Sequence, residues 1–246
     1  MARSTEADVA RLFHVHTRHL RGRPVELEVD GDRLPPRHTT YPDAPRTALP
    51  GRDFALDATL GAVLERRRSL RDYELRPLPL ETLGRLLHAS FGVRGRRPGA
   101  GDDRSAPSAG GLYPVEIYVA TQRVEGLADG VHHYDARAHA LEQVREGLFH
   151  EALVDLTMGQ DMVRAANLVF ILTGLVTRTT FKYGQRGYRY VLLDAGHVGE
   201  NLYLTATALG LGPAGIGGFL DVELGAQLTL PPGEEPLYLV CVGQPR

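Results

Sequence analysis

The longest helical pattern of the chain opens in the stretch FKYGQRGYRYVLLDAGHVGENL, which covers residues 181–202. From residue 188 to residue 209, apolar side chains recur every three or four positions and form one stripe. Further helical patterns stand at 57–66, 79–91, 147–158 and 221–228, and strand-like apolar runs stand at 115–121, 168–175 and 236–242. These segments do not alternate as regular βαβ units, so the sequence predicts an α+β domain rather than a doubly wound sheet.

The chain divides into an N-terminal arm, residues 1–53, and one main domain, residues 54–246. The arm holds a helical pattern over 5–20 and then six prolines between 21 and 52, which is typical of an extended segment. Within the main domain we expect a hairpin over 131–144, a mobile loop at 94–104 and a glycine loop at 210–218.

Charge and composition exclude several classes of protein. The 246 residues carry 28 basic and 30 acidic side chains, and this balance disfavours a nucleic-acid partner. The longest apolar run, 165–176, is too short to span a bilayer, and the N-terminus lacks a signal-peptide core. We therefore expect a cytoplasmic protein with no membrane partner. The single cysteine, Cys241, excludes an internal disulfide and a multi-thiolate metal site, and its apolar strand predicts an inert thiol.

Lys182 is the only lysine of the chain, and the other 27 basic residues are arginines. A guanidinium group keeps its proton whereas an ammonium group can release one, so a lone lysine is a candidate for proton chemistry. Tyr183 places a phenol directly beside it, and Gly184 permits a turn that brings both side chains to one side. The alternative is a surface segment in which Lys182 and its arginine neighbours are simply solvated. His197 is a second residue to watch, although a structural histidine is the commoner case.

Two further motifs are suited to an anionic, flat ligand. Arg67, Ser69 and Arg71 could hold a phosphate group through planar guanidinium forks and a hydroxyl, or could form a solvated helix end. The segment Pro107, Ser108, Ala109, Gly110 and Gly111 lets the backbone approach a ring, although a plain tight turn explains its glycines equally well. The G-x-G-x-x-G at 210–215 is not a dinucleotide fingerprint, because it follows a helix and Pro213 lacks an amide hydrogen.

Taken together, these motifs resemble the nitroreductase-like flavoproteins and, within them, the SagB-type azoline dehydrogenases. The similarity runs in order through RRSLRDY at 67–73, PSAGGLYPVEIYV at 107–119, GVHHYD at 130–135, the opening stretch, GLGPAGIGGF at 210–219 and LYLVCVGQP at 237–245. The resemblance implies a central, mostly antiparallel sheet flanked by helices. It also implies an intertwined homodimer with one FMN at each of two subunit interfaces.

The resemblance also assigns roles to individual residues. It implies that FMN is held by Arg67, Ser69, Arg71, Pro107, Ser108, Ala109, Gly110, Gly111, Gly215, Ile216, Gly217 and Arg246. Lys182 and Tyr183 match the pair required by azoline-oxidising members. Gly111 stands where ordinary nitroreductases have Asn, which favours the azoline branch, and Glu200 stands where Gln is expected.

The activity that the resemblance implies is the oxidation of thiazoline or oxazoline rings to thiazole or oxazole during peptide natural-product biosynthesis. The substrate would be an azoline-containing peptide or a carrier-bound azoline. Tyr183 would act as the base, and Lys182 would assist it or exchange roles with it. Two alternatives stay open: an NAD(P)H-dependent nitro or quinone reductase of the same fold, and a flavin-free homologue that scaffolds a biosynthetic complex.

Overall fold

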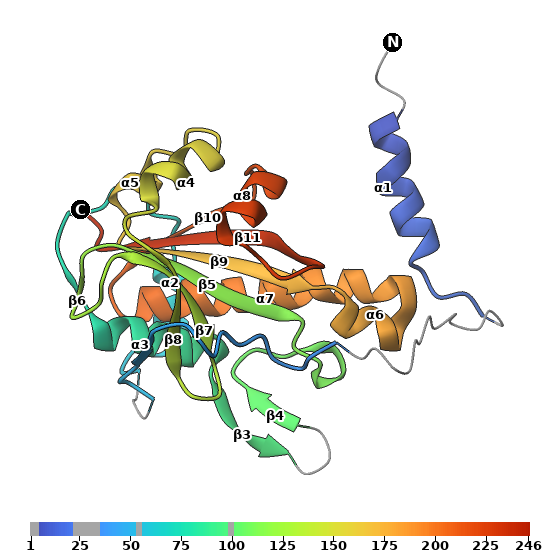
Figure 1. The fold of residues 1–246 in the computed structure, drawn as a ribbon, viewed down its shortest axis with the longest axis horizontal. Coiled ribbons are helices and arrows are strands. Elements are labelled where there is room, and N and C mark those ends of the chain that lie inside the picture. The colour runs from blue at the N-terminus through green and yellow to red at the C-terminus, as the bar shows by residue number, and fades with distance from the viewer. Residues whose placement is uncertain (1–4, 22–34, 53–55, 98–100) are drawn as a thin grey trace.

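The computed structural model describes residues 5–21, 35–52, 56–97 and 101–246. One seven-stranded sheet forms its centre, in the order β1-β8-β7-β5-β9-β11-β10, and all neighbouring strands run antiparallel (Figure 1). Its strands are β1 (Arg46–Ala48), β5 (Val115–Thr121), β7 (Gly130–Asp135), β8 (Ala140–Glu146), β9 (Leu168–Leu175), β10 (Gly212–Ile216) and β11 (Glu234–Gly243). The predicted α+β fold with an antiparallel sheet is therefore confirmed.

Helices cover both faces of this sheet. Every residue of β5 and β9 is buried, because these central strands have packed layers above and below them. The helix α3 (Leu80–Phe91) and the long helix α7 (Gly187–Ala208) pack on one face. The opposite face carries α4 (His150–Leu156), α5 (Met162–Ala165) and α8 (Asp221–Leu228), as Figure 1 shows. No helix in the described part of the chain is long and apolar enough to cross a membrane.

Residues 181–202, where the longest helix is predicted to begin, contain a break in the helix at Gly184. The short helix α6 (Thr177–Tyr183) ends on the Lys-Tyr pair, and a 3-10 turn, η2 (Gly184–Arg186), leads into α7. Gly184 takes a positive φ of 57°, which glycine tolerates better than other residues. The predicted turn after Tyr183 is therefore present, and it places the pair at the junction of two helices.

Two predicted loops contain strands instead. In the 94–104 stretch, β3 (Val93–Arg97) pairs with β4 (Gly101–Arg104). The side chains of Asp102 and Arg104 are buried and hydrogen-bonded to Arg137 and His38, so these charged residues are not solvated as a loop would leave them. In the 210–218 stretch, β10 pairs with β11, and its glycines leave room for the rings of Tyr73 and Tyr238. The expectation of loops was wrong at both places.

The remaining elements are short. They are the helix α2 (Leu60–Arg66), the 3-10 turn η1 (Ala109–Gly111) and the parallel pair of β2 (Leu78–Pro79) with β6 (Val124–Glu125). The cap of α2 is the hydroxyl of Thr59, which accepts the N–H of Ala62. The helix predicted over 57–66 therefore begins at Leu60.

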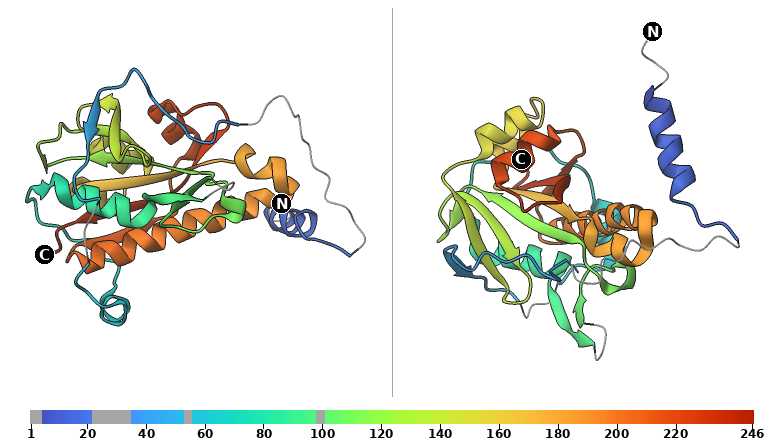
Figure 2. Two further views of the ribbon diagram at one scale, coloured as in Figure 1. Left: turned by 90° about the horizontal axis from the view of Figure 1, so that it is seen from below. Right: turned by 45° about the vertical axis from the view of Figure 1, so that its right-hand side comes forward.

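The N-terminal arm contacts the main domain through several of its segments. Its helix α1 (Thr5–His16) lies where α6 and α7 meet, and both views of Figure 2 show it outside the layered body. Arg186 donates to the carbonyl of Thr17 at 2.9 Å, and Arg189 donates to that of His14 at 2.7 Å. Strand β1 joins the sheet edge by pairing with β8, so this part of the expected arm belongs to the sheet. The proposed boundary at 53–54 lies outside the described residues.

Candidate functional site

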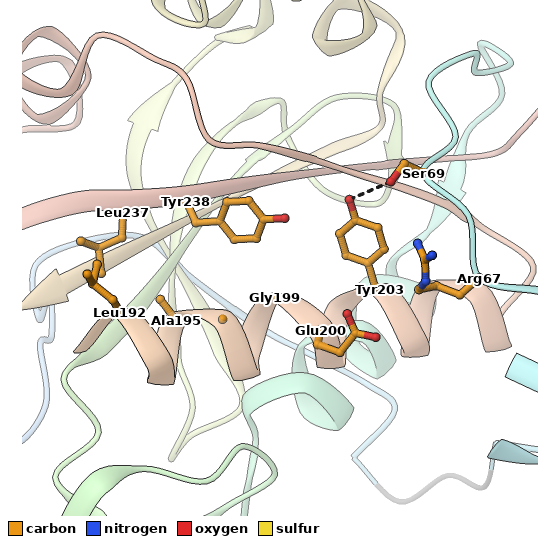
Figure 3. A pocket seen from close by; sticks show the side chains of 10 residues that line it. Arg67, Ser69, Leu192, Ala195, Gly199, Glu200, Tyr203, Leu237 and Tyr238 are labelled. Carbon is orange, nitrogen blue, oxygen red and sulfur yellow. Dashed lines mark hydrogen bonds between the residues drawn. The ribbon is translucent and has the colours of Figure 1, made fainter. Parts of the chain in front are cut away.

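A cavity of about 460 Å³ lies between α7, β11 and the segment that follows α2 (Figure 3). Its walls are formed by Arg67, Ser69, Leu192, Ala195, Gly196, Gly199, Glu200, Tyr203, Leu237 and Tyr238. Figure 3 shows Arg67 and Ser69 at one end and the two leucines at the other. The cavity therefore has a polar, cationic end and an apolar end, as an elongated ligand with an anionic group requires.

Tyr203 stands at the polar end and connects three chain segments. Its hydroxyl lies 3.3 Å from Ser69 Oγ and accepts a hydrogen bond from the backbone N–H of Gly215. The guanidinium carbon of Arg67 lies 5.8 Å from the centre of its ring. Two segments predicted to hold phosphate and ring, around Arg67 and Gly215, thus meet at one phenol.

Tyr238 lies along the same cavity, and glycines make room for it. A Cβ added to Gly215 would lie 1.9 Å from the Tyr238 hydroxyl, and one added to Gly199 would lie 2.7 Å from its ring. Burial, with smaller contributions from the neighbouring Tyr203 and Glu200, raises the pKa of Tyr238 to about 12, so this phenol stays protonated. The sequence analysis missed Tyr203 and Tyr238. The sequence offers one signal for Tyr203: it stands four residues after Gly199, and so lies on the same face of α7. It offers no comparable signal for Tyr238.

Other residues of the predicted cofactor set lie outside this cavity wall. Arg71 is exposed and donates to the carbonyl of Ser69 at 3.5 Å. Arg246 is also exposed and pairs with Asp72 at 3.4 Å. Ile216 is buried in β10 and Gly217 is exposed beyond it. Of the predicted phosphate motif, only Arg67 and Ser69 therefore line the cavity.

The predicted ring-contacting turn lies on another side of α7. Ser108 donates its hydroxyl hydrogen to Asp194 Oδ2 at 2.5 Å, and its oxygen accepts the N–H of Tyr113 at 2.9 Å. The N–H of Ala109 also bonds to Asp194, whose pKa is raised by burial. Asp194 thereby fixes the start of the turn to α7.

Gly110 brings this turn against the Lys-Tyr pair. A Cβ added to Gly110 would lie 2.5 Å from the Tyr183 hydroxyl and 2.9 Å from Lys182 Nζ. The amine lies 5.4 Å from the centre of the Tyr183 ring, and that ring packs edge-on against Tyr190 at 5.0 Å. Lys182 is exposed and Tyr183 is half-buried, so both polar groups remain accessible beside the glycine. Pro107 and Gly111 of the same turn are exposed.

The cavity and the turn occupy opposite faces of α7. Asp194 and Tyr203 are nine residues apart, about two and a half helical turns, and so point in opposite directions. The other α7 residues of the cavity, from Leu192 to Gly199, also lie away from Asp194 by the same periodicity. The chain therefore carries two separate candidate sites, the Arg67–Tyr203 cavity and the Gly110–Lys182–Tyr183 cluster.

Two other residues singled out in the sequence lie outside the cavity wall. Cys241 is fully buried and burial raises the pKa of its thiol to about 12, which confirms the expected inert cysteine. His197 is exposed on α7 and is not part of the cavity wall.

Comparison with known proteins identifies the family. The model of the nitroreductase family matches residues 64–244. The provisional nitroreductase MJ1384 of Methanocaldococcus jannaschii is 38% identical over 182 residues, which cover 74% of this chain and 89% of that protein. The microcin B17-processing protein McbC of Escherichia coli is 29% identical over 160 residues, which cover 62% of this chain and 57% of McbC.

The solved structures include a nitroreductase-type protein of Anabaena variabilis, with a TM-score of 0.74 and 27% identity. That similarity covers 96% of this chain and 47% of the Anabaena chain. The family model covers most of the chain and the structural similarity extends over nearly all of it, so the chain belongs to the nitroreductase family.

Proposed function

We propose that this protein is an FMN-dependent oxidase that converts thiazoline or oxazoline rings to thiazole or oxazole. The observation that carries the proposal is the meeting of Gly110, Lys182 and Tyr183, which places an amine and a phenol beside a turn free of side chains. A base and an open backbone surface at one point are what the removal of a ring proton needs.

The cavity residues fit FMN. Arg67 and Ser69 offer a cation and a hydroxyl to the phosphate, and the Glu200 carboxylate can accept hydrogen bonds from ribityl hydroxyls. The rings of Tyr203 and Tyr238, together with Gly196 and Gly199, give the cavity flat surfaces for an aromatic ring system. When bound, FMN would accept the two electrons and one hydrogen that leave the substrate ring as it becomes aromatic.

A homodimer would bring together two candidate sites that lie apart in one chain. Because they lie on opposite faces of α7, the Gly110–Lys182–Tyr183 cluster of one protomer could complete the Arg67–Tyr203 cavity of its partner. The exposed Leu192 and Leu193 on α7 give that helix an apolar surface for a second copy. In this arrangement the turn from one chain would lie along the flavin ring held by the other.

In the proposed reaction Tyr183 takes the second ring hydrogen as a proton, and Lys182 supplies a charge and a proton-exchange partner beside it. The half-burial of Tyr183 against Tyr190 fixes the direction of its hydroxyl. Gly110 keeps the space over the turn free, so the substrate ring can approach both groups.

A peptide is the proposed substrate, free or on a carrier. The similarity to McbC, a protein named for processing microcin B17, supports a peptide carrying azoline rings. The absence of a side chain at Gly111, where ordinary nitroreductases have Asn, is consistent with the same branch.

The test is a turnover assay on the purified, FMN-reconstituted chain. Peptides bearing a thiazoline or an oxazoline are incubated in air, and mass spectrometry follows the loss of two hydrogens per ring. Conversion supports the proposal. Intact azolines, in a sample whose flavin reduces nitro compounds with NADPH, would contradict it.

That outcome would favour the second candidate function, an NAD(P)H-dependent nitro or quinone reductase. The observation in its favour is the 38% identity to the provisional nitroreductase MJ1384, which this chain matches over 89% of that protein.

A further inference from the structure

Arg178 is the largest fully buried side chain of the described residues, with 2% of its surface exposed. It lies on α6, one helical turn before Lys182. Its Nε donates to the carbonyl of Pro36 at 2.7 Å, and one terminal nitrogen donates to the carbonyl of Tyr113 at 3.2 Å. That nitrogen also pairs with Glu116 at 2.5 Å, and the other donates to Thr39 Oγ1 at 3.1 Å.

These bonds tie α6 to three other parts of the chain. Tyr113 ends the turn that contains Gly110, and Glu116 belongs to the central strand β5. Pro36 and Thr39 belong to an N-terminal segment, residues 36–41, that we call the strap. The N–H of Thr39 is bonded to Glu116 at 3.0 Å, so Arg178 and Glu116 hold the strap from two sides.

The ion pair at the centre of this arrangement is firmly charged. Burial alone would raise the pKa of Glu116, but hydrogen bonding to His133 and the charges of Arg178 and His133 hold it far below its usual range. A charged carboxylate and a guanidinium group buried together leave no freedom for either side chain to turn away.

We propose that Arg178 is a positioning residue, which holds the Lys182–Tyr183 pair at its working distance from the turn at Gly110 with the help of the strap. A planar guanidinium group can bond the Tyr113 carbonyl, Glu116 and the strap at fixed angles at once. Since Arg178, Lys182 and Tyr183 all lie on α6, the bonds that hold Arg178 in place also hold the Lys182–Tyr183 pair. This inference rests on the proposed function for its consequence in catalysis, but the positioning can be measured without it.

The single lysine provides the probe. Reductive methylation with ¹³C-formaldehyde labels Lys182 and the N-terminal amine, and Lys182→Arg identifies the signal of Lys182 in the NMR spectrum. The full chain is measured with and without FMN, and unlabelled samples of the same proteins are assayed for thiazoline oxidation. The variant is Arg178→Gln, because a lysine at this position would add a second label.

The matched control is Arg123→Gln. Arg123 is half-buried and donates to the carbonyl of Ala165 at 2.6 Å and to Gln122 at 2.7 Å. It lies just after Thr121, which pairs with Leu168 at the end of β9 remote from α6. Both substitutions remove a guanidinium group that bonds a carbonyl, but the control leaves the strap and the turn intact.

We expect Arg178→Gln to shift the methyl signal of Lys182 and to lower kcat at least about tenfold, with a much smaller change in KM. Arg123→Gln should leave the signal and kcat unchanged. A folded Arg178→Gln protein with the Lys182 signal and kcat of the original chain would overturn the proposal.

Thr39→Val gives the same answer if Arg178→Gln does not fold, because it removes one acceptor of Arg178 and keeps the ion pair. The Lys182 signal should then shift to a smaller extent, and an unchanged signal would overturn the proposal. The two claims can fail separately. If the original chain oxidises no azoline while the signal shifts, the proposed function fails and the positioning stands.

Discussion

Lys182 is the side chain at which the proposed chemistry can be tested with the smallest change. Lys182→Arg keeps the positive charge beside Tyr183 but removes a group that can exchange a proton. We expect the variant to fold and retain FMN, and to lose most of its azoline turnover. Flavin absorbance and product mass measure the two properties. Full turnover in this variant would remove Lys182 from the reaction.

Arg67 is the side chain at which the proposed FMN binding can be tested. A charge-assisted hydrogen bond contributes roughly 1.5–3 kcal/mol, so Arg67→Ala should weaken FMN binding about tenfold or more without unfolding the chain. Arg68→Ala is the matched control, because Arg68 is exposed and donates to the backbone carbonyls of Glu65 and Arg67. Fluorescence titration with FMN measures both. Equal affinities of the two variants would count against the phosphate assignment.

At the scale of elements, the turn 107–111 lies against the end of α6 at Gly110. In the proposed function, this close approach is needed for turnover. Gly110→Ala adds a methyl group against Tyr183 and Lys182 at a φ of +64°. Gly126→Ala adds one at a φ of +74° with nothing within 4 Å. Both variants should lose about 1 kcal/mol of stability from the left-handed backbone, whereas Gly110→Ala alone should lower turnover. Thermal unfolding measures the loss of stability, and turnover assays measure the loss of activity. Equal turnover in both variants would show that the close approach of Gly110 to Tyr183 and Lys182 is not needed for activity.

The elements also show which parts of the fold a single sequence can reveal. Apolar runs predict the strands at 115–121 and 168–175, and apolar periodicity predicts the helix at 187–208. Both patterns come directly from burial. The β3–β4 hairpin did not follow, since the charges of Asp102 and Arg104 indicate solvent until their partners in distant segments are known. Composition describes each segment alone, whereas burial depends on what packs against it.

The candidate site divides in the same way. The Lys-Tyr pair could be predicted because a single lysine among arginines is evident from the sequence. The Gly110 turn could be predicted because its two adjacent glycines are equally evident. Tyr203 was missed because its partners Ser69 and Gly215 are remote in sequence. Arg178 was missed because it is one of 27 arginines and only its contacts with Pro36 and Glu116 distinguish it.

At the scale of the whole molecule, a buried charge cluster makes stability depend on pH. His133 lies 2.9 Å from Glu142 and 3.4 Å from Glu116. Burial would lower the pKa of His133, but the two carboxylates outweigh it and raise the pKa to about 9 from an ordinary 6.5. The stabilisation from this group is therefore fully present below pH 6.5 and is lost as the pH rises through 9.

We accordingly expect the unfolding temperature to fall between pH 6.5 and 9, and we expect His133→Gln to flatten this part of the profile. Glutamine keeps a hydrogen-bonding side chain near the carboxylates but does not titrate. Calorimetry over a series of pH values measures both proteins. Parallel profiles for the two proteins across this interval would show that His133 is not the responsible group.

In the proposed function, flavin held at the Arg67 cavity would take electrons from an azoline ring whose proton would leave to the Lys182–Tyr183 pair. Anaerobic mixing of the FMN-loaded protein with a thiazoline peptide tests it most directly, with flavin absorbance as the signal. The account predicts that the yellow colour bleaches in step with thiazole formation, and that Lys182→Arg bleaches far more slowly. A flavin that stays oxidised with the thiazoline, yet bleaches at once with NADPH, would contradict it.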